Sequence, residues 1–152
     1  MLRTSLFDIL RPRIEGAKLL DLFAGIGSLG LEGLSRGASF CVFIEQDLKC
    51  IRALRENVAT LGFQDRARIV KIDAFEVSEG GPYDVVIVDP PYRFFEEARL
   101  RAKVIELLGC FRARAIIAAG SVVVVKHGRG HGPEGAQDVR RYGDTELSFY
   151  YA

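Results

Sequence analysis

The sequence has little of what marks several broad classes of protein. It contains no apolar run long enough to cross a membrane as a helix, because charged residues and prolines interrupt its hydrophobic stretches. The opening MLRTSLFDILRPRIEG is interrupted in the same way, so no signal peptide is expected. Internal repeats and linker-like segments are missing as well. We therefore expect a single domain over residues 1–152 that works in the cytoplasm, as a monomer, with no membrane partner.

The sequence also has no excess of charge of one sign, and it has few cysteines. The 21 basic and 20 acidic residues leave a formal net charge of +1, so contact with nucleic acid would need a local basic patch. The three cysteines form neither a C-x-x-C motif nor an even set, which is typical of a reducing compartment. We interpret Cys41, Cys50 and Cys110 as small core residues and not as catalytic thiols. His127 and His131 have no third ligand at a suitable spacing, so no metal site is predicted.

What the sequence does contain is an alternation of strand-like and helix-like segments. Strands are expected at 19–23, 40–45, 67–73, 83–89 and 121–127, and helices at 3–10, 28–36, 47–61 and 94–109. A closing hairpin is expected from 138–142 to 146–151, turning at Gly143-Asp144. This order predicts an α/β fold with a doubly wound, mostly parallel, seven-stranded Rossmann-like sheet. The C-terminal antiparallel hairpin is typical of the methyltransferase version of that sheet and not of the NAD-binding version.

A glycine-rich loop lies between the first strand and the following helix. Gly25-Ile26-Gly27-Ser28-Leu29-Gly30 is a G-x-G-x-x-G motif, and Glu45 follows at the spacing of a ribose-binding acid. The loop alone is a weak signal, and it is as typical of NAD binding as of other nucleotides. The neighbouring acidic residues are therefore needed to decide which ligand the loop holds.

Four acidic residues fall at the ends of four predicted strands: Asp21, Glu45, Asp73 and Asp89. Ligands of doubly wound sheets bind at this edge, although carboxylates that only cap loops are the alternative interpretation. A carboxylate beside the pyrophosphate of NAD would be repelled, by about 4 kcal/mol at ~4 Å and an intermediate dielectric. The same carboxylate attracts the ammonium and the sulfonium of S-adenosylmethionine. The acids therefore favour S-adenosyl-L-methionine, with S-adenosyl-L-homocysteine as product.

Each part of that cofactor has expected partners. Asp21 would bind the ammonium directly or through water, and the glycines would let the backbone approach the methionine portion. Glu45 would accept the ribose hydroxyls, Asp73 the adenine amino group, and the Ala74 N–H would bond a ring nitrogen. The complete expected set is Asp21, Phe23, Gly25, Gly27, Glu45, Gln46, Asp73, Ala74 and Asp89.

Asp89-Pro90-Pro91-Tyr92 supplies a candidate for the chemistry. The exocyclic amine of a base is a poor nucleophile because its lone pair is delocalised into the ring. Hydrogen bonds from its N–H groups to the Asp89 carboxylate and the Pro90 carbonyl would hold the nitrogen closer to tetrahedral, and Tyr92 would stack on the base. Two prolines make such a loop rigid. We predict Asp89, Pro90 and Tyr92 as catalytic residues, and a plain turn is the alternative.

Basic residues near the end of the chain are candidates for substrate contact. Lys126, Arg140 and Arg141, together with Tyr92, are predicted to bind the substrate, the three cations through phosphates. Ordinary solvated charge is an equally simple interpretation. Arg99 and its neighbours Arg101 and Lys103 are expected on the exposed side of a helix, where they would only be solvated.

These motifs together resemble the bacterial RsmD family of ribosomal RNA guanine-N2 methyltransferases. The resemblance is carried by LDLFAGIGSLGLEGLSRGA, FIEQD, IDAF, DPPY and the terminal RRYGDTELSFYY, and it extends from Ser5 to Tyr150. D-P-P-Y is shared with DNA and protein amino-methyltransferases, so it indicates methylation of an amine but does not identify the target. The stretch from Tyr142 to Tyr150 is the more family-specific feature.

The resemblance implies a substrate, and it shows two departures. The implied substrate is a guanine 2-amino group of small-subunit (16S) ribosomal RNA, within the small subunit or an assembly intermediate, reached by base flipping. Family members usually carry an N-terminal β-hairpin and an Arg-Pro-Thr-x-Asp-like stretch before the first helix, and this chain begins at about that helix. A glutamate is expected where Lys126 stands. The alternatives that stay open are a DNA adenine-N6 or protein glutamine methyltransferase, a non-catalytic docking module and, more remotely, an NAD dehydrogenase.

Overall fold

Helices and strands alternate along the chain. The structure, a computed structural model, describes residues 2–91 and 96–152. Its elements, with η for 3₁₀ helices, are α1 (Leu2–Ile14), β1 (Lys18–Leu22), α2 (Ser28–Ser35), β2 (Phe40–Ile44), α3 (Leu48–Thr60), η1 (Gln64–Arg66), β3 (Ala67–Val70), η2 (Ala74–Glu76), β4 (Val85–Val88), α5 (Ala98–Cys110), β5 (Val122–Gly128), β6 (Asp138–Tyr142) and β7 (Thr145–Tyr151). No helix in this part of the chain is long and apolar enough to cross a membrane.

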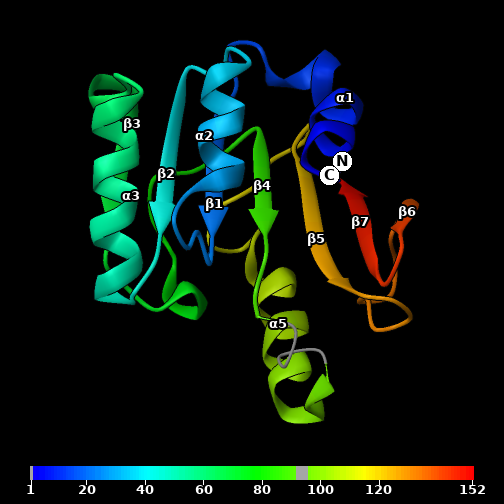
Figure 1. Cartoon of the computed structure of the whole chain (residues 1–152). Coiled ribbons are helices and arrows are strands. Elements are labelled where there is room, and N and C mark those ends of the chain that lie inside the picture. Colours follow the sequence, from blue (N-terminus) through cyan, green and yellow to red (C-terminus); the bar gives the residue numbers. More distant parts are fainter. Residues whose placement is uncertain (1, 92–95) are drawn as a thin grey trace.

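The strands form one sheet in the order β3-β2-β1-β4-β5-β7-β6 (Figure 1). β1 to β5 are parallel, and β7 lies antiparallel between β5 and β6. The predicted seven-stranded, doubly wound sheet with its closing hairpin is therefore confirmed. The chain runs outward from β1 to β3 and then returns to β4 on the other side of β1. This reversal makes the carboxyl ends of β1 and β4 the topological switch point, where such sheets bind ligands.

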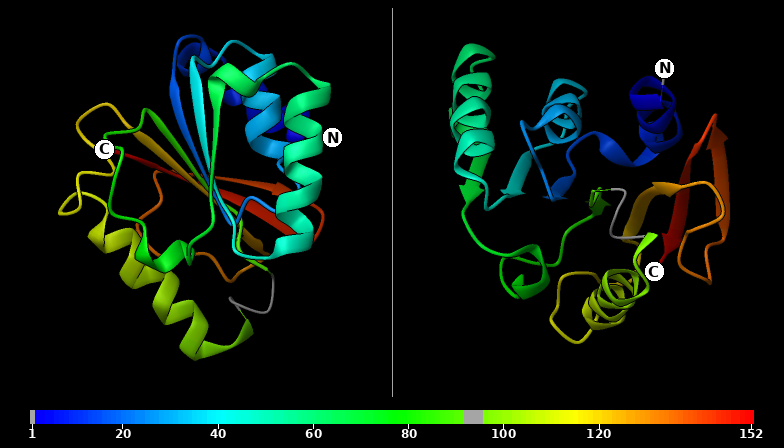
Figure 2. Two further views of the ribbon diagram at one scale, coloured as in Figure 1. Left: turned by 90° about the vertical axis from the view of Figure 1, so that its left-hand side faces the viewer. Right: turned by 60° about the horizontal axis from the view of Figure 1, so that its bottom comes forward.

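Helices cover both faces of the sheet. α1, α2 and α3 lie side by side on one face, and α5 covers the other (Figure 2). Alternate residues of each strand supply the two cores: Leu19 and Ile87 pack toward α1 and α2, whereas Leu20 and Val86 pack in the opposite cluster. Because β1 and β4 are buried on both faces, they read as continuous apolar runs, and Asp21 stands out as a charge inside such a run.

The ends of the elements follow local signals, with some differences from expectation. Asp47 caps α3 by accepting a hydrogen bond from Lys49 N–H, as its sequence position predicts. α1 is longer than expected and continues through Pro12, because the buried Leu10 and Ile14 keep its last turn packed. β3 is shorter than expected, because the Ile72 N–H donates a hydrogen bond to the Val70 C=O and the chain turns there. The helix expected at 94–109 corresponds to α5, which spans Ala98–Cys110; residues 94 and 95 of the expected range lie outside the described part.

Candidate active site

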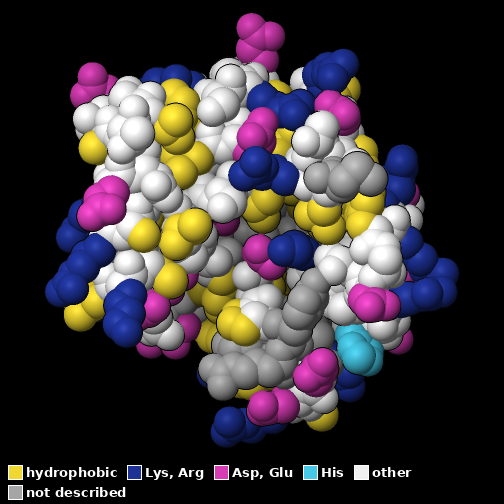
Figure 3. Space-filling model, viewed as in Figure 1, with side chains coloured by type: hydrophobic (Ala, Val, Ile, Leu, Met, Phe, Trp, Pro, Cys, Tyr) yellow, Lys and Arg dark blue, Asp and Glu magenta, His cyan; other side chains and the backbone are white. Residues whose placement is uncertain are grey.

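A cleft opens at the carboxyl ends of the parallel strands, around the switch point. We call it the cofactor cleft; its volume is about 720 Å³, and it is lined by Phe23, Gly25, Ile44, Glu45, Gln46, Asp47, Cys50, Ile72, Asp73, Ala74, Phe75, Asp89, Pro90, Pro91, Leu100, Lys103 and Lys126. An adjoining cavity of about 470 Å³, the inner cavity, shares Asp89 and Lys126 and adds Asp21, Ser28 and the first residues of α1. In the view of Figure 3, acidic and basic side chains meet in a hollow of the surface.

The structure gathers most of the predicted cofactor residues in these two spaces. Phe23, Gly25, Glu45, Gln46, Asp73, Ala74 and Asp89 line the cofactor cleft, and Asp21 lines the inner cavity. Gly27 lines neither. It has a φ of +90°, and a Cβ there would clash with Leu54, so it serves the turn and its packing against α3.

Asp21 is the most buried acid of the site. It is only 1% exposed, and its Oδ2 accepts a hydrogen bond from Gly30 N–H at 3.0 Å. Burial raises the pKa of this carboxyl well above its usual range; the Gly30 hydrogen bond opposes that rise, and the charges of Asp89 and Glu45 add to it. A cationic ligand in the inner cavity would relieve this unfavourable burial of charge.

Glu45 is fixed between the glycine loop and the start of α3. Its Oε1 accepts from Gly25 N–H at 2.8 Å, and its Oε2 accepts from Gln46 N–H and Asp47 N–H at 3.0 Å each. A carboxylate has about four acceptor positions, so one direction on Oε1 stays available to a ligand hydroxyl. The backbone thus orients this carboxylate before any ligand arrives.

Asp73 caps η2 and Ala74 is its first residue, whereas β3 already ends at Val70. The expectation that Asp73 ends the third strand was therefore wrong, although the residue still reaches the cofactor cleft. Asp73 Oδ1 accepts from Phe75 N–H at 3.0 Å and caps the short helix. Within the described residues no hydrogen bond uses the Ala74 N–H, which leaves this donor for a ligand at the cleft wall.

Asp89 and Pro90 form the wall next to Asp21. Asp89 follows β4, and its Oδ2 lies 3.5 Å from Lys126 Nζ, with both side chains 28% exposed. Burial raises the pKa of Asp89, and the charge of Lys126 lowers it. Pro90 is buried and Pro91 exposed. Tyr92, the third predicted catalytic residue, lies outside the described residues.

The three cations predicted to bind substrate do not form one patch. Lys126 faces Asp89, whereas Arg140 and Arg141 stand on β6, at the far edge of the sheet beyond β7. Arg140 pairs with Asp138 at 3.0 Å, and Arg141 pairs with Glu146 at 2.7 Å. Both arginines stay at least half exposed, so their outer N–H groups can still reach a phosphate.

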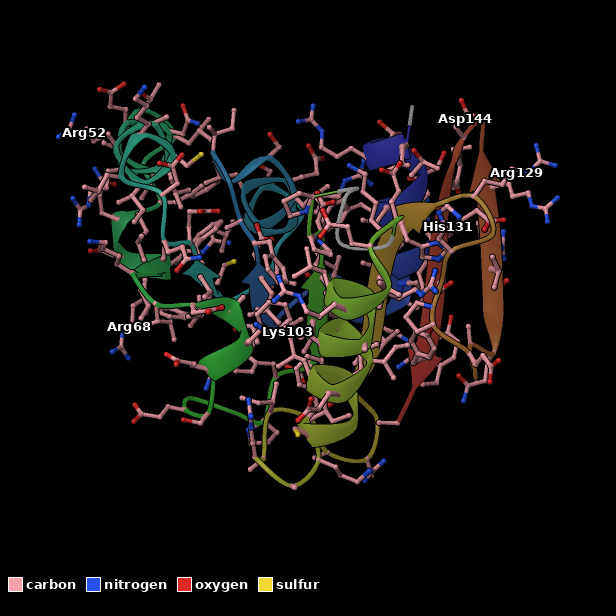
Figure 4. All side chains as sticks on the ribbon, turned by 90° about the horizontal axis from the view of Figure 1, so that it is seen from below. Arg52, Arg68, Lys103, Arg129, His131 and Asp144 are labelled. Atoms are coloured by element: carbon pink, nitrogen blue, oxygen red, sulfur yellow. The ribbon has the colours of Figure 1, made fainter. Side chains whose placement is uncertain are left out.

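Several cleft residues were missed or misread from the sequence. Lys103 was expected to be only solvated, but its Nζ lies 4.5 Å from the centroid of the Phe75 ring and lines the cleft (Figure 4). Phe75 also meets Phe23 edge-on at 5.6 Å, and its place directly after Asp73-Ala74 could have indicated it. Cys41 is buried as expected, whereas Cys50 is half-buried and lines the cleft. His127 is buried against Ser148.

Comparison with known proteins identifies the family to which the chain belongs. The family model described as conserved hypothetical protein 95 matches residues 1–151. Ribosomal RNA small subunit methyltransferase D of Escherichia coli (strain K12) is 45% identical over 93 residues, which make up 60% of this chain and 46% of that protein. The chain thus spans about half the length of this curated relative.

Solved structures share the fold of this chain over nearly its whole length. A conserved hypothetical protein of Streptococcus pyogenes superposes with a TM-score of 0.84 at 25% identity, covering 97% of this chain and 93% of the other. A hypothetical protein of Thermus thermophilus gives 0.77 at 30% identity, covering 99% and 85%. The resemblance to the RsmD-type proteins is confirmed, and the chain belongs to the conserved hypothetical protein 95 family.

Proposed function

We propose that the chain is an S-adenosyl-L-methionine-dependent methyltransferase that methylates the 2-amino group of a guanine in small-subunit ribosomal RNA. The observation that carries this proposal is that buried Asp21 lines the same cavity as Asp89 at the switch point between β1 and β4, while Asp89 and Pro90 both line the adjoining cofactor cleft. The Asp21 carboxylate fits a cationic ligand, and the acceptors of Asp89 and Pro90 fit a neutral amine. The E. coli relative is named for ribosomal RNA methylation, which supports the choice of substrate.

The residues present fit S-adenosylmethionine better than a dinucleotide. Asp21 and Asp89 both line the inner cavity, so a pyrophosphate there would meet two carboxylates. A ligand with an ammonium and a sulfonium would instead be attracted there, mainly by Asp21, because Asp89 already pairs with Lys126. Glu45 would hold the ribose, and Asp73, the Ala74 N–H and the Phe75 ring would hold the adenine. When bound, the cofactor supplies an activated methyl group on a positively charged sulfur.

The chain's own part in the reaction is to hold the amine. The Asp89 carboxylate and the Pro90 carbonyl would accept its two N–H groups, which localises the nitrogen lone pair and aims it at the methyl group. The adjacent prolines keep the two acceptors in a fixed arrangement. Catalysis of this kind depends on positioning and electrostatics. In the same proposal Tyr92 stacks on the flipped base.

The RNA would lie across the β5 to β7 side of the cleft. Arg140 and Arg141 are the proposed phosphate contacts, because they are exposed and stand near the end of β6 on the rim. The partner is ribosomal RNA within the small subunit or its assembly intermediate. One domain over residues 1–152, a monomeric state and a cytoplasmic location remain part of the proposal.

A panel of methyl acceptors tests the proposal. The chain is incubated with radiolabelled S-adenosylmethionine and, in parallel, with small ribosomal subunits lacking the modification, free ribosomal RNA, duplex DNA and total protein. We expect label in the ribosomal RNA, on N2 of guanine after nuclease digestion. Label on adenine of DNA or on protein glutamine would replace the proposed substrate. Cofactor binding with no labelled acceptor would favour a docking module.

A further inference from the structure

Lys126 is the basic residue that lies against Asp89. β4 and β5 pair in parallel with Val88 opposite Val125, so the residues that follow, Asp89 and Lys126, are neighbours at the same end of the sheet. The Nζ to Oδ2 distance of 3.5 Å is long for a hydrogen bond, which makes the contact mainly an ion pair. Both groups are largely withdrawn from water, where screening is weaker than at the surface.

Four acidic and three basic side chains line the two cavities around Asp89. They comprise Asp21 on β1, Glu45 and Asp47 after β2, Asp73 before η2, Arg3 on α1, Lys103 on α5 and Lys126 on β5. Arg3 Nε lies 3.6 Å from Glu32, and Lys103 Nζ lies over the Phe75 ring. Among the residues that the structure describes, Lys126 is therefore the cation that pairs with Asp89.

The position of Lys126 also decides which carboxylate oxygen is available. Its ammonium contacts Oδ2 of Asp89, so Oδ1 is left to accept an N–H from an incoming amine. Burial raises the pKa of Asp89 and so works against its ionised form, and a protonated carboxyl would offer the amine a donor in place of an acceptor. A fixed cation at Oδ2 opposes this protonation.

We propose that Lys126 is a positioning residue, which keeps Asp89 ionised and turns its Oδ1 toward the amine. The inference rests on the proposed function and deepens it. It also replaces the sequence-based expectation that Lys126 binds a phosphate, because the lysine faces into the site and the arginines on β6 do not share its location.

The test measures the titration of Asp89 directly. Carbon-13 NMR of the full chain follows the aspartate carboxyl signals with pH, and Asp89→Asn identifies the signal of interest. In Lys126→Gln the midpoint of Asp89 should move up by about one pH unit, the low end of the effect of a neighbouring opposite charge. Lys126→Arg should restore most of the wild-type value. Arg52→Gln, which removes an exposed charge on α3 at the other side of the sheet, is the matched control and should not move it.

Single-turnover methylation gives the second readout. In Lys126→Gln the acidic limb of the pH–rate profile should shift to higher pH by the same amount. The rate should therefore be about tenfold lower than that of the wild type on the acidic side of the limb and should recover on its alkaline side. Affinity for S-adenosylhomocysteine should stay within a factor of about three, since Asp21 and Glu45 carry it.

Four results would overturn the assignment or the function beneath it. An Asp89 midpoint that does not move in Lys126→Gln removes the positioning role, and so does a midpoint that moves without a change in the pH–rate profile. If that variant instead loses RNA affinity with a shallower salt dependence, Lys126 is a phosphate contact. A wild-type chain that methylates nothing, while the midpoint still shifts, overturns the proposed function and supports the effect of the lysine on Asp89.

Discussion

At the scale of one residue, Asp21 shows that a carboxylate placed to bind a cationic ligand can lower the stability of the chain when no ligand is bound. Burial raises the pKa of this carboxyl in the folded chain above its unfolded value of about 4. The folded state therefore holds the proton more tightly than the unfolded state does. The resulting stabilisation is fully present below about pH 4 and is lost as the pH rises through the folded pKa. Ionising Asp21 therefore lowers the stability of the cofactor-free chain.

Replacing this charge should separate the two effects. Asp21→Asn keeps an oxygen that can accept from Gly30 N–H but carries no charge. We expect a higher free energy of unfolding at pH 8 and a shallower decline as the pH rises above about 4. S-adenosylmethionine should bind about 10- to 100-fold more weakly, the scale of one hydrogen bond to a charged group. Urea denaturation at several pH values and calorimetric titration measure both quantities.

The control for that variant is Asp65→Asn on the exposed η1. It removes the same charge from the surface and should change neither quantity appreciably. If Asp21→Asn were less stable than the wild type at pH 8, or bound the cofactor equally well, the account of Asp21 would be wrong.

At the scale of elements, the third glycine of the loop fixes how closely α2 approaches the sheet. A Cβ on Gly30 would clash with the ring of Phe43 and come within 2.9 Å of Asp21 Oδ2 and Cys41 Sγ. Gly30 N–H is also the donor that orients Asp21. Close packing of the helix and formation of the site therefore depend on the same residue.

Gly30→Ala should destabilise the chain by about 1–3 kcal/mol, because the added methyl group overpacks a filled core. Gly109 offers a matched control in another helix. Among the described residues, no atom beyond its chain neighbours and its own helix backbone lies within 4 Å of a Cβ placed there, so Gly109→Ala should be neutral or stabilise by up to about 1 kcal/mol through reduced backbone entropy. Thermal unfolding compares the two variants. Equal effects at both positions would contradict the close-packing role of Gly30.

The same scale explains what the sequence could predict. Apolar periodicity located the parallel strands and most helices, because burial on one or both faces leaves a regular pattern. The acids at positions 21, 45 and 89 were placed correctly because parallel strands end at a common rim. The end of β3, the reach of Lys103 to Phe75 and the pairing of Lys126 with Asp89 depend on contacts between distant segments, which no local pattern records.

At the scale of the whole molecule, the cofactor cleft is not confined to one face of the sheet. α1, α2 and α3 cover one face, α5 covers the other, and the cofactor cleft draws residues from both. Its walls join the ends of β1, β2 and β4 to η2 and α5. A ligand bound there would hold these segments together, so its binding should be coupled to global unfolding.

S-adenosylhomocysteine should therefore raise the unfolding temperature of the full chain, whereas NAD should not. At a hundredfold excess over Kd the ligand adds about 2.7 kcal/mol to the free energy of unfolding. Differential scanning calorimetry with each ligand, and with adenosine as a control for the shared moiety, gives the comparison. A shift with NAD and none with S-adenosylhomocysteine would reverse the interpretation of the acidic rim.

The central claim is that Asp89 holds the amine during methyl transfer, whereas Asp21, Glu45 and Asp73 supply most of the affinity for the cofactor. It is tested most directly by the single-turnover rate of methyl transfer to guanine of small-subunit RNA, measured in the wild type and in Asp89→Ala, with S-adenosylmethionine affinity measured on the same samples. We predict that the rate falls by about two to three orders of magnitude, the effect of losing one preorganised polar contact, while the affinity stays nearly unchanged. An undiminished rate in Asp89→Ala would contradict the account.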